Sequence, residues 1–289
     1  MTTGAVSRSG RWRALYALRV IHPLPTVANA LSVGMFALIA RHGRPPIGSL
    51  LVLLATIFLI QGSIGAANDA FDIDLDRLSK PYKPIVAGAI SRRAAVVVAV
   101  ISAIAACAIA SSFGLAAWLL AMTGLACGIT YDAGLKSTRF SVLAYVLAMP
   151  LLPLWVWVAL DRFSLGLLWV YPFGILIGIS LYLGNTAPDI ASDTAAGIAG
   201  TAHRIGLGRT LIGAWGCLGL TLGLGPILAG VAGLNTGLVA ATSAGASLWL
   251  VAAVLVSVRN TDPARLRISW VLTIASSLIF ALGWLTGAS

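Results

Sequence analysis

The sequence contains no glutamate and has little charge of either sign. Only 10% of its 289 residues are charged: nine are acidic, all of them aspartate, and 19 are basic. Soluble globular chains carry roughly a quarter. So few charged side chains cannot cover a surface that faces water, and the mean hydropathy of +0.96 points the same way. We therefore expect an integral membrane protein, which excludes a soluble two-domain enzyme, a disordered scaffold and a nucleic-acid-binding protein despite the net charge of +10.

Cysteine is also scarce. Cys107, Cys127 and Cys217 are the three cysteines, and all fall within long apolar stretches. An odd, widely spaced set of this kind predicts packing residues rather than disulfides or a metal site. Arg19 and His22 interrupt the N-terminal region before any clean apolar stretch, so we expect no cleavable signal there.

Long apolar stretches are abundant. A helix that crosses a bilayer needs roughly 20 mostly apolar residues. Nine stretches qualify, at 24–41, 48–67, 93–112, 115–131, 141–160, 164–184, 210–232, 236–257 and 268–286. None shows the alternation that is typical of strands in a membrane barrel. We predict an all-α fold, a polytopic membrane bundle of nine transmembrane helices that forms a single domain over residues 1–289.

The basic residues predict how these spans are oriented. Sixteen of the 19 fall in the N-terminal tail or in loops after even-numbered spans, and only Arg41, Arg44 and Arg162 fall on the other side. Cytoplasmic loops of membrane proteins are enriched in Lys and Arg. We therefore expect a basic cytoplasmic segment at 1–20, cytoplasmic loops at 68–92 and 185–209, and an external C-terminus, in the plasma membrane if the protein is bacterial. Topology and anionic lipid headgroups then account for the positive charge.

Seven of the nine aspartates fall in three of the predicted cytoplasmic loops. Two of these loops repeat the pattern Asn-x3-Asp-x3-Asp, as a first cluster and a second cluster, which comprise Asn68, Asp72 and Asp76, and Asn185, Asp189 and Asp193. Residues four apart share one face of a helix. Each cluster would thus line up as a stripe where a helix leaves the membrane, although Pro188 is expected to distort the second stripe.

Like charges at this spacing repel, so the repeated arrangement needs a partner. The alternative, an acidic loop that is merely solvated, explains one cluster better than two identical ones. A divalent cation neutralises paired carboxylates, and oxygen ligands without His or Cys favour Mg²⁺. We predict that five residues of the two clusters bind Mg²⁺: Asn68, Asp72, Asp76, Asp189 and Asp193.

Basic side chains follow both clusters. Arg77, Lys80 and Lys83 follow the first cluster, and His203 and Arg204 follow the second. Carboxylates, Mg²⁺ and Lys or Arg around one cavity are typical of a diphosphate site. The alternative is that these basic residues only reflect the enrichment of Lys and Arg in cytoplasmic loops.

The third acidic loop holds Tyr131, Asp132 and Lys136. Asp132 and Lys136 are four apart and could form an ordinary helical salt bridge. Alternatively, Lys136 contacts a phosphate and Tyr131 lines the mouth of the cavity. The repeated clusters suggest two equivalent halves that face each other across a central cavity.

At these residues the sequence resembles the UbiA-type intramembrane prenyltransferase superfamily. The first family motif, N-D-x-x-D-x-x-x-D, is matched by Asn68, Asp69, Asp72 and Asp76, and Lys83-Pro84 matches the basic-Pro sequence that follows it. Asp189 and Asp193 match the second motif, D-x-x-x-D. The segment from Tyr131 to Lys136 resembles the family's tyrosine and lysine loop, although Lys136 lies five residues after Tyr131, where some members have four.

The resemblance implies nine helices around a lipid-open cavity and two Mg²⁺ ions that clamp the diphosphate of an isoprenoid donor. It implies catalytic roles for Asp72, Asp76, Asp189, Asp193, Lys136 and Tyr131. It implies substrate contacts from Asn68, Asp69 and Lys83. From their positions in or beside the clusters, we also expect contacts from Asn185, Arg77, Lys80 and Arg204. Metals and cations would stabilise the charge on the leaving diphosphate, while an apolar cavity would keep the allylic cation from water. An electron-rich acceptor, aromatic or lipid-like, would then attack.

Polar side chains inside the spans are candidates for contacting this acceptor, because membrane interiors otherwise exclude them. Asn29 and Gln61 are the best placed, although each could simply bond to a neighbouring helix. Trp155, Trp157 and Tyr171 could line the cavity or serve as packing and interfacial residues.

Two alternatives remain open. One is a terpene cyclase on the same scaffold, in which no external acceptor is used. The other is a non-catalytic protein such as a transporter, which is disfavoured because the acids lie at the mouth and not deep in the spans.

Overall fold

The computed structural model describes residues 15–195 and 197–288, and over these residues its regular secondary structure is entirely helical. Most of the predicted N-terminal basic segment, including Arg8, Arg11 and Arg13, lies outside the described residues. The all-α prediction is confirmed.

Long helices account for most of the described chain. They are α2 (Pro23–Ala40), α3 (Ile47–Phe71), α5 (Arg92–Ala110), α6 (Gly114–Asp132), α7 (Leu143–Ala159), α8 (Val170–Thr186), α11 (Leu207–Val231), α12 (Thr236–Ser257) and α13 (Pro263–Gly287). Each overlaps one predicted span. Short α-helices connect them: α4 (Ile73–Ser79), α9 (Ile190–Ala195) and α10 (Thr201–Ile205). The 3₁₀ turns are η1 (Leu18–Ile21), η2 (Ser111–Phe113), η3 (Leu135–Ser137), η4 (Leu165–Trp169) and η5 (Ala187–Asp189).

Seven helical stretches of the described chain are long and apolar enough to cross a membrane. One of these, Arg92–Asp132, contains both α5 and α6, which η2 joins. The helix α7 is apolar but has only 17 residues. The protein is therefore an integral membrane helical bundle, and the number of nine membrane spans stays a prediction.

The surface of the bundle is apolar, as a lipid environment requires. Leu31, Leu51, Ile104 and Leu248 are among the large hydrophobic side chains that are more than half exposed. Water would penalise such a surface, whereas hydrocarbon does not. The lipid-facing helices thus explain the scarcity of charge in the sequence.

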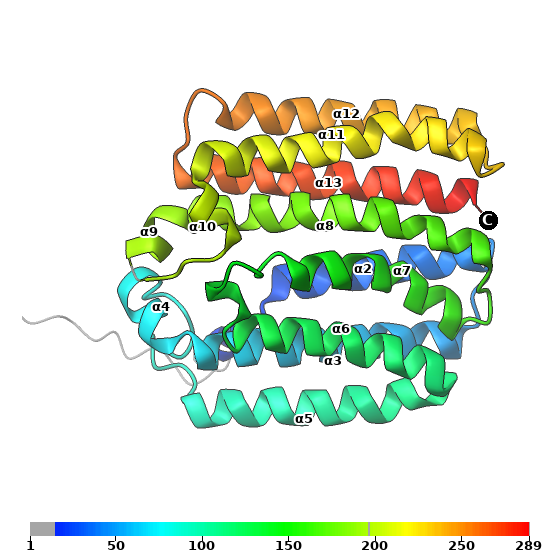
Figure 1. Cartoon of the computed structure of the whole chain (residues 1–289). Helices are drawn as coiled ribbons and strands as arrows, with labels where there is room; N and C mark the ends of the chain where they lie inside the picture. The colour runs from blue at the N-terminus through cyan, green and yellow to red at the C-terminus, as the bar shows by residue number, and fades with distance from the viewer. Residues whose placement is uncertain (1–14, 196, 289) are drawn as a thin grey trace, which may run out of the picture.

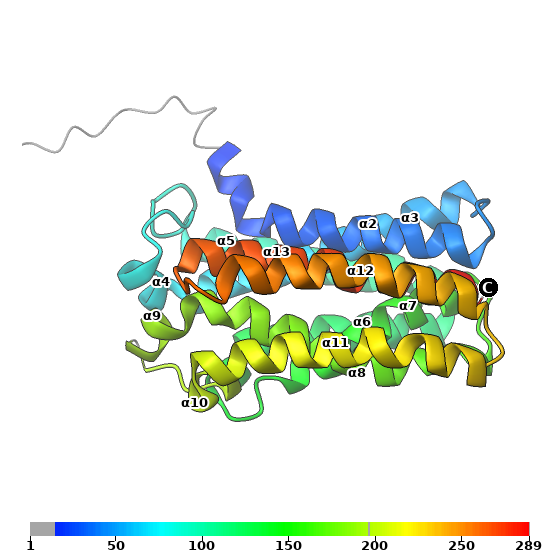
Figure 2. The ribbon, with the colours of Figure 1, turned by 90° about the horizontal axis from the view of Figure 1, so that it is seen from above.

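The long helices run side by side, and the connections that carry the motifs gather at one end (Figures 1 and 2). The short helices α4, α9 and α10 lie at this end, together with η1, and the C-terminus lies at the other. The predicted even-numbered loops therefore share one end of the bundle. We call it the motif end, and its location on the cytoplasmic side stays a prediction.

Glycine allows two close approaches that shape the motif end. A Cβ on Gly178 of α8 would lie 2.7 Å from the backbone oxygen of Tyr145 in α7. A Cβ on Gly65 of α3 would lie 2.9 Å from the carbonyl carbon of Ile21 in η1. Both distances are too short for any real Cβ. Small residues let backbones approach in this way in membrane bundles.

Candidate active site at the motif end of the bundle

The first cluster lies where α3 changes into α4. The helix α3 ends at Phe71, Asp72 separates the two helices, and α4 begins at Ile73. The stripe is therefore bent at Asp72 and does not follow one straight helix. The first two residues of the stripe still lie side by side as expected, because the amide nitrogen of Asn68 donates to Asp72 over 3.0 Å.

The second cluster lies on a similarly broken helix. The helix α8 ends at Thr186, η5 contains Pro188, and α9 continues from Ile190. The expected distortion at Pro188 takes the form of this 3₁₀ turn, although Ala187, which precedes the proline, stays in the α region. A proline ring clashes with the preceding turn of an α-helix, which explains a 3₁₀ turn at this point.

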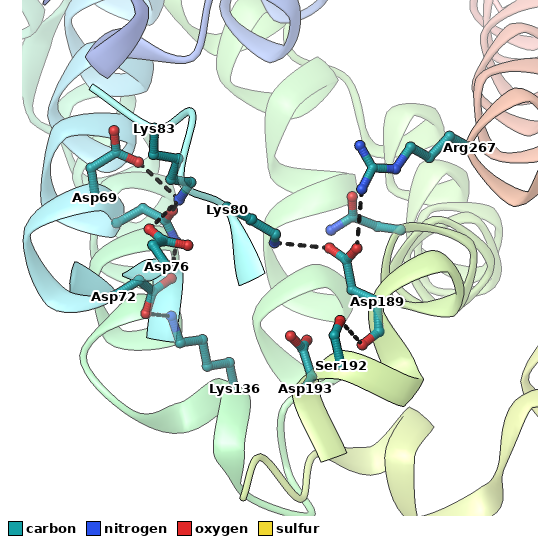
Figure 3. A network of polar contacts seen from close by, with 12 residues as sticks. Asp69, Asp72, Asp76, Lys80, Lys83, Lys136, Asp189, Ser192, Asp193 and Arg267 are labelled. Carbon is teal, nitrogen blue, oxygen red and sulfur yellow. Dashed lines mark hydrogen bonds and ion pairs between the residues drawn. The ribbon is translucent and has the colours of Figure 1, made fainter. Parts of the chain in front are cut away.

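Lys83 connects three residues of the first motif. Its Nζ lies 2.9 Å from Asp69 Oδ1, 2.9 Å from Asp76 Oδ2 and 2.9 Å from Asn68 Oδ1. Asp69 is 1% exposed and Asp76 is 2% exposed, so both carboxylates are buried away from water. A buried carboxylate needs a cationic partner, and Lys83 is shared between these two (Figure 3).

Asn68 links the first motif to α6. Its amide nitrogen donates to Asp132 Oδ1 over 2.7 Å as well as to Asp72. Asp132 is the last residue of α6 and is buried. One carboxamide thus connects α3, α6 and the loop that holds Lys83.

Lys136 pairs with Asp72 and not with Asp132. The alternative of a helical salt bridge between Asp132 and Lys136 is therefore wrong. The reason is that α6 ends at Asp132, and Gly134, with a φ of 143°, turns the chain away before Lys136. The turn carries Lys136 toward the first cluster.

Lys80 joins the two clusters. Its Nζ lies 2.9 Å from Asp189 Oδ2, and Arg267 of α13 approaches the other oxygen of Asp189 at 3.4 Å. Figure 3 shows Lys80 reaching from the side of the first cluster across to the second. The two clusters therefore lie near each other at the motif end, while the predicted equivalence of two halves across a central cavity stays a prediction.

The second cluster also contacts a histidine. His203 Nε2 lies 3.5 Å from Asp193 Oδ2, and neither ring nitrogen of His203 has a hydrogen-bond partner among the described residues. Asn185 donates instead to the hydroxyl of Tyr145 over 3.0 Å. Asn185 therefore turns toward α7, while the carboxylates of its cluster turn to the mouth.

Two predicted substrate contacts do not lie in this network. Arg77 is 62% exposed and pairs with Asp74, which is itself exposed. Arg204 is exposed and donates to the backbone oxygen of Ala199. Of the two basic residues after the second cluster, His203 is the one that turns inward.

Tyr131 lies in a row of three tyrosines beside the clusters. Its ring centroid is 5.7 Å from that of Tyr145, which is 5.6 Å from that of Tyr182. The Tyr182 hydroxyl lies 2.6 Å from Ser141 Oγ, which also accepts from the backbone of Thr201. This row fixes the 139–141 segment against α10.

Asn29 and Gln61 line one cavity within the bundle, and their contact with an acceptor stays a prediction. The cavity has a volume of about 80 Å³, and Trp155, Met149 and Ile57 also line it. Gln61 precedes Asn68 by seven residues of α3, which places it about 10 Å deeper in the bundle at a rise of about 1.5 Å per residue. Trp157 and Tyr171 pack within the core instead.

The three lysines of the chain, Lys80, Lys83 and Lys136, are all in this network, and each is paired with aspartate. Burial lowers the pKa of Lys80 and Lys83, but the facing carboxylates outweigh it and hold both pKa values above the ordinary lysine value. Burial also raises the pKa of Asp76, which Lys83 offsets only in part.

The donor set fits Mg²⁺ better than a metal held by protein alone. Within the described ranges no three His, Cys, Asp or Glu side chains lie close enough to hold an ion. Mg²⁺ is usually bound through one or two carboxylates together with waters and substrate phosphates. Asp69 Oδ2 and Asp193 Oδ1 are buried and have no hydrogen-bond partner within the part of the chain that the structure describes, so carboxylate oxygens remain available.

Sequence reasoning did not select His22, Arg267 or Tyr145. His22 Nε2 lies 2.9 Å from Asp69 Oδ1. These three residues stand far from the motifs in sequence and reach them only through helix packing. The only feature of the sequence that could have indicated these three residues is that each is a polar side chain near the end of an apolar stretch.

Comparison with known proteins decides the family. A model of the UbiA prenyltransferase family matches residues 29–277. The chain belongs to the UbiA prenyltransferase family. The resemblance found in the aspartate motifs is thereby confirmed, and both clusters lie inside the matched region.

Relatives within the UbiA family have similar sequences. The digeranylgeranylglyceryl phosphate synthase of Methanoregula boonei is 28% identical over 272 residues, which cover 88% of this chain and 91% of that protein. The protein of the same name from Pyrococcus abyssi is 29% identical over 163 residues, 56% of this chain. This second match spans 58% of the relative's length.

Solved structures of UbiA homologues have the same fold. The apo structure of a homologue from Aeropyrum pernix K1 matches with a TM-score of 0.72 and 20% identity, over 89% of this chain and 96% of that one. A homologue from Archaeoglobus fulgidus bound to DMAPP and Mg²⁺ matches with a TM-score of 0.66 and 17% identity, over 92% and 99%. At these identities the likeness concerns the fold.

Proposed function

We propose that this protein is a Mg²⁺-dependent intramembrane prenyltransferase that uses an allylic prenyl diphosphate as donor. One observation carries the proposal: two aspartate clusters meet at one end of an apolar bundle and are bridged by Lys80 and Asp189. Seven aspartates and three lysines gathered there fit a polyanion that is bound together with divalent cations.

The residues of the motif end have different roles in ionising the donor. Mg²⁺, when bound, supplies positive charge against the diphosphate, and two ions held by the two clusters would suit its size. Lys80, Lys83 and Lys136 hold the phosphate oxygens and stabilise the negative charge that develops on them. The C1–O bond breaks with its electron pair left on the diphosphate, and the apolar cavity keeps water from the allylic cation. Tyr131 presents an aromatic ring beside this site.

The acceptor attacks C1 with an electron pair and then loses a proton. Two acceptor classes have specific support. The names of the relatives favour a glyceryl phosphate lipid, whose phosphate would stay at the charged mouth. The polar pair Asn29 and Gln61, deeper in the bundle, favours a neutral aromatic acceptor that reaches below the mouth.

The test is a reconstitution in liposomes with Mg²⁺ and prenyl diphosphates of several lengths. Each donor is incubated with a glyceryl phosphate lipid, with a phenolic acceptor, or with no acceptor, and products and diphosphate release are followed by mass spectrometry. We expect a prenylated product with one acceptor class and none after chelation with EDTA, with recovery when Mg²⁺ is restored.

Other outcomes separate the alternatives. A hydrocarbon or terpene alcohol formed without acceptor would identify a cyclase. Absence of both diphosphate release and product with every donor, with Asp72→Asn unchanged in every measurement, would contradict the enzyme proposal and leave a transporter or another non-catalytic role.

A further inference from the structure

The joint between η1 and α2 has an unusual backbone. His22 has a φ of 50° and a ψ of 72°, in the left-handed region, and Pro23 follows it directly. Non-glycine residues rarely adopt this conformation, which usually persists only where surrounding contacts enforce it. Thr26 provides such contacts, since its hydroxyl donates to the backbone oxygens of Ile21 and His22 over 2.7 and 3.1 Å.

The packing of η1 on α3 also fixes this joint. The backbone of Val20 and Ile21 lies against Gly65, where a Cβ would be 3.0 Å or less from both residues. Gly65 and Asp69 are four residues apart on α3 and therefore share a face. The segment that fits over Gly65 thus carries His22 directly over Asp69.

The His22 side chain reaches the buried carboxylate of the first motif. Its Nε2 lies 2.9 Å from Asp69 Oδ1, the same oxygen that Lys83 approaches at 2.9 Å. A carboxylate only accepts hydrogen bonds, so Nε2 is the donor. Among the described residues, His22 and Lys83 are the two side chains that contact this carboxylate.

We infer that His22 is a positioning residue that keeps Asp69 paired when Lys83 turns to the diphosphate. The inference rests on the proposed function. Lys83 neutralises two buried carboxylates, and leaving a buried charge without a partner is strongly unfavourable. With His22 in place, Asp69 keeps one charge-assisted hydrogen bond, and Lys83 is free to bind phosphate oxygens. Without His22, Asp69 holds Lys83 more tightly and competes with the ligand.

The test compares His22→Gln with His22→Asn in the full protein in liposomes. The amide nitrogen of Gln reaches about as far as Nε2, whereas that of Asn is shorter. Asn, however, tolerates the left-handed conformation better than Gln. A contact with Asp69 predicts that Gln retains function and Asn does not, while a purely backbone role predicts the reverse order.

The first readout is the dissociation constant of inorganic pyrophosphate in the presence of Mg²⁺, measured by titration calorimetry. We expect His22→Asn to weaken binding about tenfold, the effect of one hydrogen bond to a charged group, and His22→Gln to weaken it less than threefold. Matched controls come from His42, which also has a positive φ but lies between α2 and α3, away from the motif end. His42→Asn and His42→Gln should leave the affinity unchanged.

The second readout needs no ligand. A double-mutant cycle of His22→Leu and Asp69→Asn on thermal unfolding should show coupling, because the two side chains contact each other. Additive effects in this cycle, or equal affinities for the Asn and Gln variants, would overturn the inference while the wild type still binds pyrophosphate. If the wild type itself binds no pyrophosphate with Mg²⁺, this contradicts the proposed function, and the inferred role of His22 is then contradicted as well.

Discussion

Each lysine of the motif end is paired with a carboxylate that would also serve a metal ion. Lys136 pairs with Asp72, Lys80 with Asp189, and Lys83 with Asp69 and Asp76. Ligand binding must therefore exchange one set of ion pairs for another, with phosphate oxygens replacing carboxylates at the lysines. Because these lysines and carboxylates are buried or half-buried, we expect the exchange to keep every charge compensated.

Loss of one cluster carboxylate should remove activity without removing the fold. We expect Asp72→Asn and Asp189→Asn to lower the rate of diphosphate release by roughly 100-fold or more, because each contributes to stabilising the leaving group. Asp161, in the connection between α7 and α8, provides the control. Its φ of 53° is one that Asn tolerates, so Asp161→Asn should keep near-normal activity. Equal losses in all three variants would contradict the two-cluster model.

The lysine pKa values predict a sensitivity to alkaline pH. Lys83 has a folded pKa above 10.5, so its pairing contributes stability that is complete below 10.5 and is lost as the pH rises through the folded value. We expect the unfolding temperature of the Mg²⁺-free protein to fall over this range. Lys83→Met should be less stable at neutral pH and show a shallower fall, as measured by thermal unfolding in detergent. If the unfolding temperature fell equally steeply with pH in the wild type and in Lys83→Met, this would argue against the ion pairs of Lys83 with Asp69 and Asp76.

The residues of the site were more predictable than their pairings. Aspartates repeated at four-residue spacing, in a chain so poor in acids, were enough to identify both clusters. The partners of Lys136 and Lys80 could not be predicted, because they depend on a turn at Gly134 and on the meeting of two loops. Arg77 and Arg204 had the right sequence positions but lie outside the network.

At the scale of elements, both motif helices are interrupted at the membrane exit. The proline at 188 gave a local signal for the second break, whereas no helix-breaking residue stands at Asp72. The location of helices followed from long apolar stretches. Their relative placement depends on side-chain packing that hydropathy does not encode.

Contact between α7 and α8 places Tyr145 beside Asn185, and Gly178 permits this contact. Gly178→Ala should destabilise the protein by roughly 1–3 kcal/mol, because the new methyl group would overlap the backbone of Tyr145. Thermal unfolding measures the effect. Gly216→Ala on α11 is the matched control, since a Cβ there meets nothing within 4 Å. It should be neutral or slightly stabilising, because alanine favours a helix more than glycine does.

At the scale of the whole molecule, the basic loops and the motifs share one end, whereas the C-terminus lies at the other (Figure 1). The sequence predicted this division from charge alone, since the loops rich in Lys and Arg are the ones that meet in space. Hydropathy suggested nine spans, but the apolar stretches of the structure do not fix that number.

Cysteine labelling can test which end faces the cytoplasm. The three native cysteines are free and can be replaced with alanine. Thr138→Cys and Asn260→Cys would then mark loops of the motif end, and Ser164→Cys the connection between α7 and α8. With a membrane-impermeant maleimide on intact cells, we expect labelling at 164 alone, and at all three positions after permeabilisation. Labelling at 138 and 260 in intact cells would reverse the proposed topology.

Concentrating all three lysines at the motif end makes the site chemically addressable. An amine-reactive reagent has only these side chains and the N-terminal amine to modify in the whole chain. The mass added to the intact protein beyond one N-terminal label therefore reports on the three lysines, without any mutation. A donor or pyrophosphate that engages the lysines would shield them, so a library of prenyl diphosphates could be ranked by the mass shift that each one prevents.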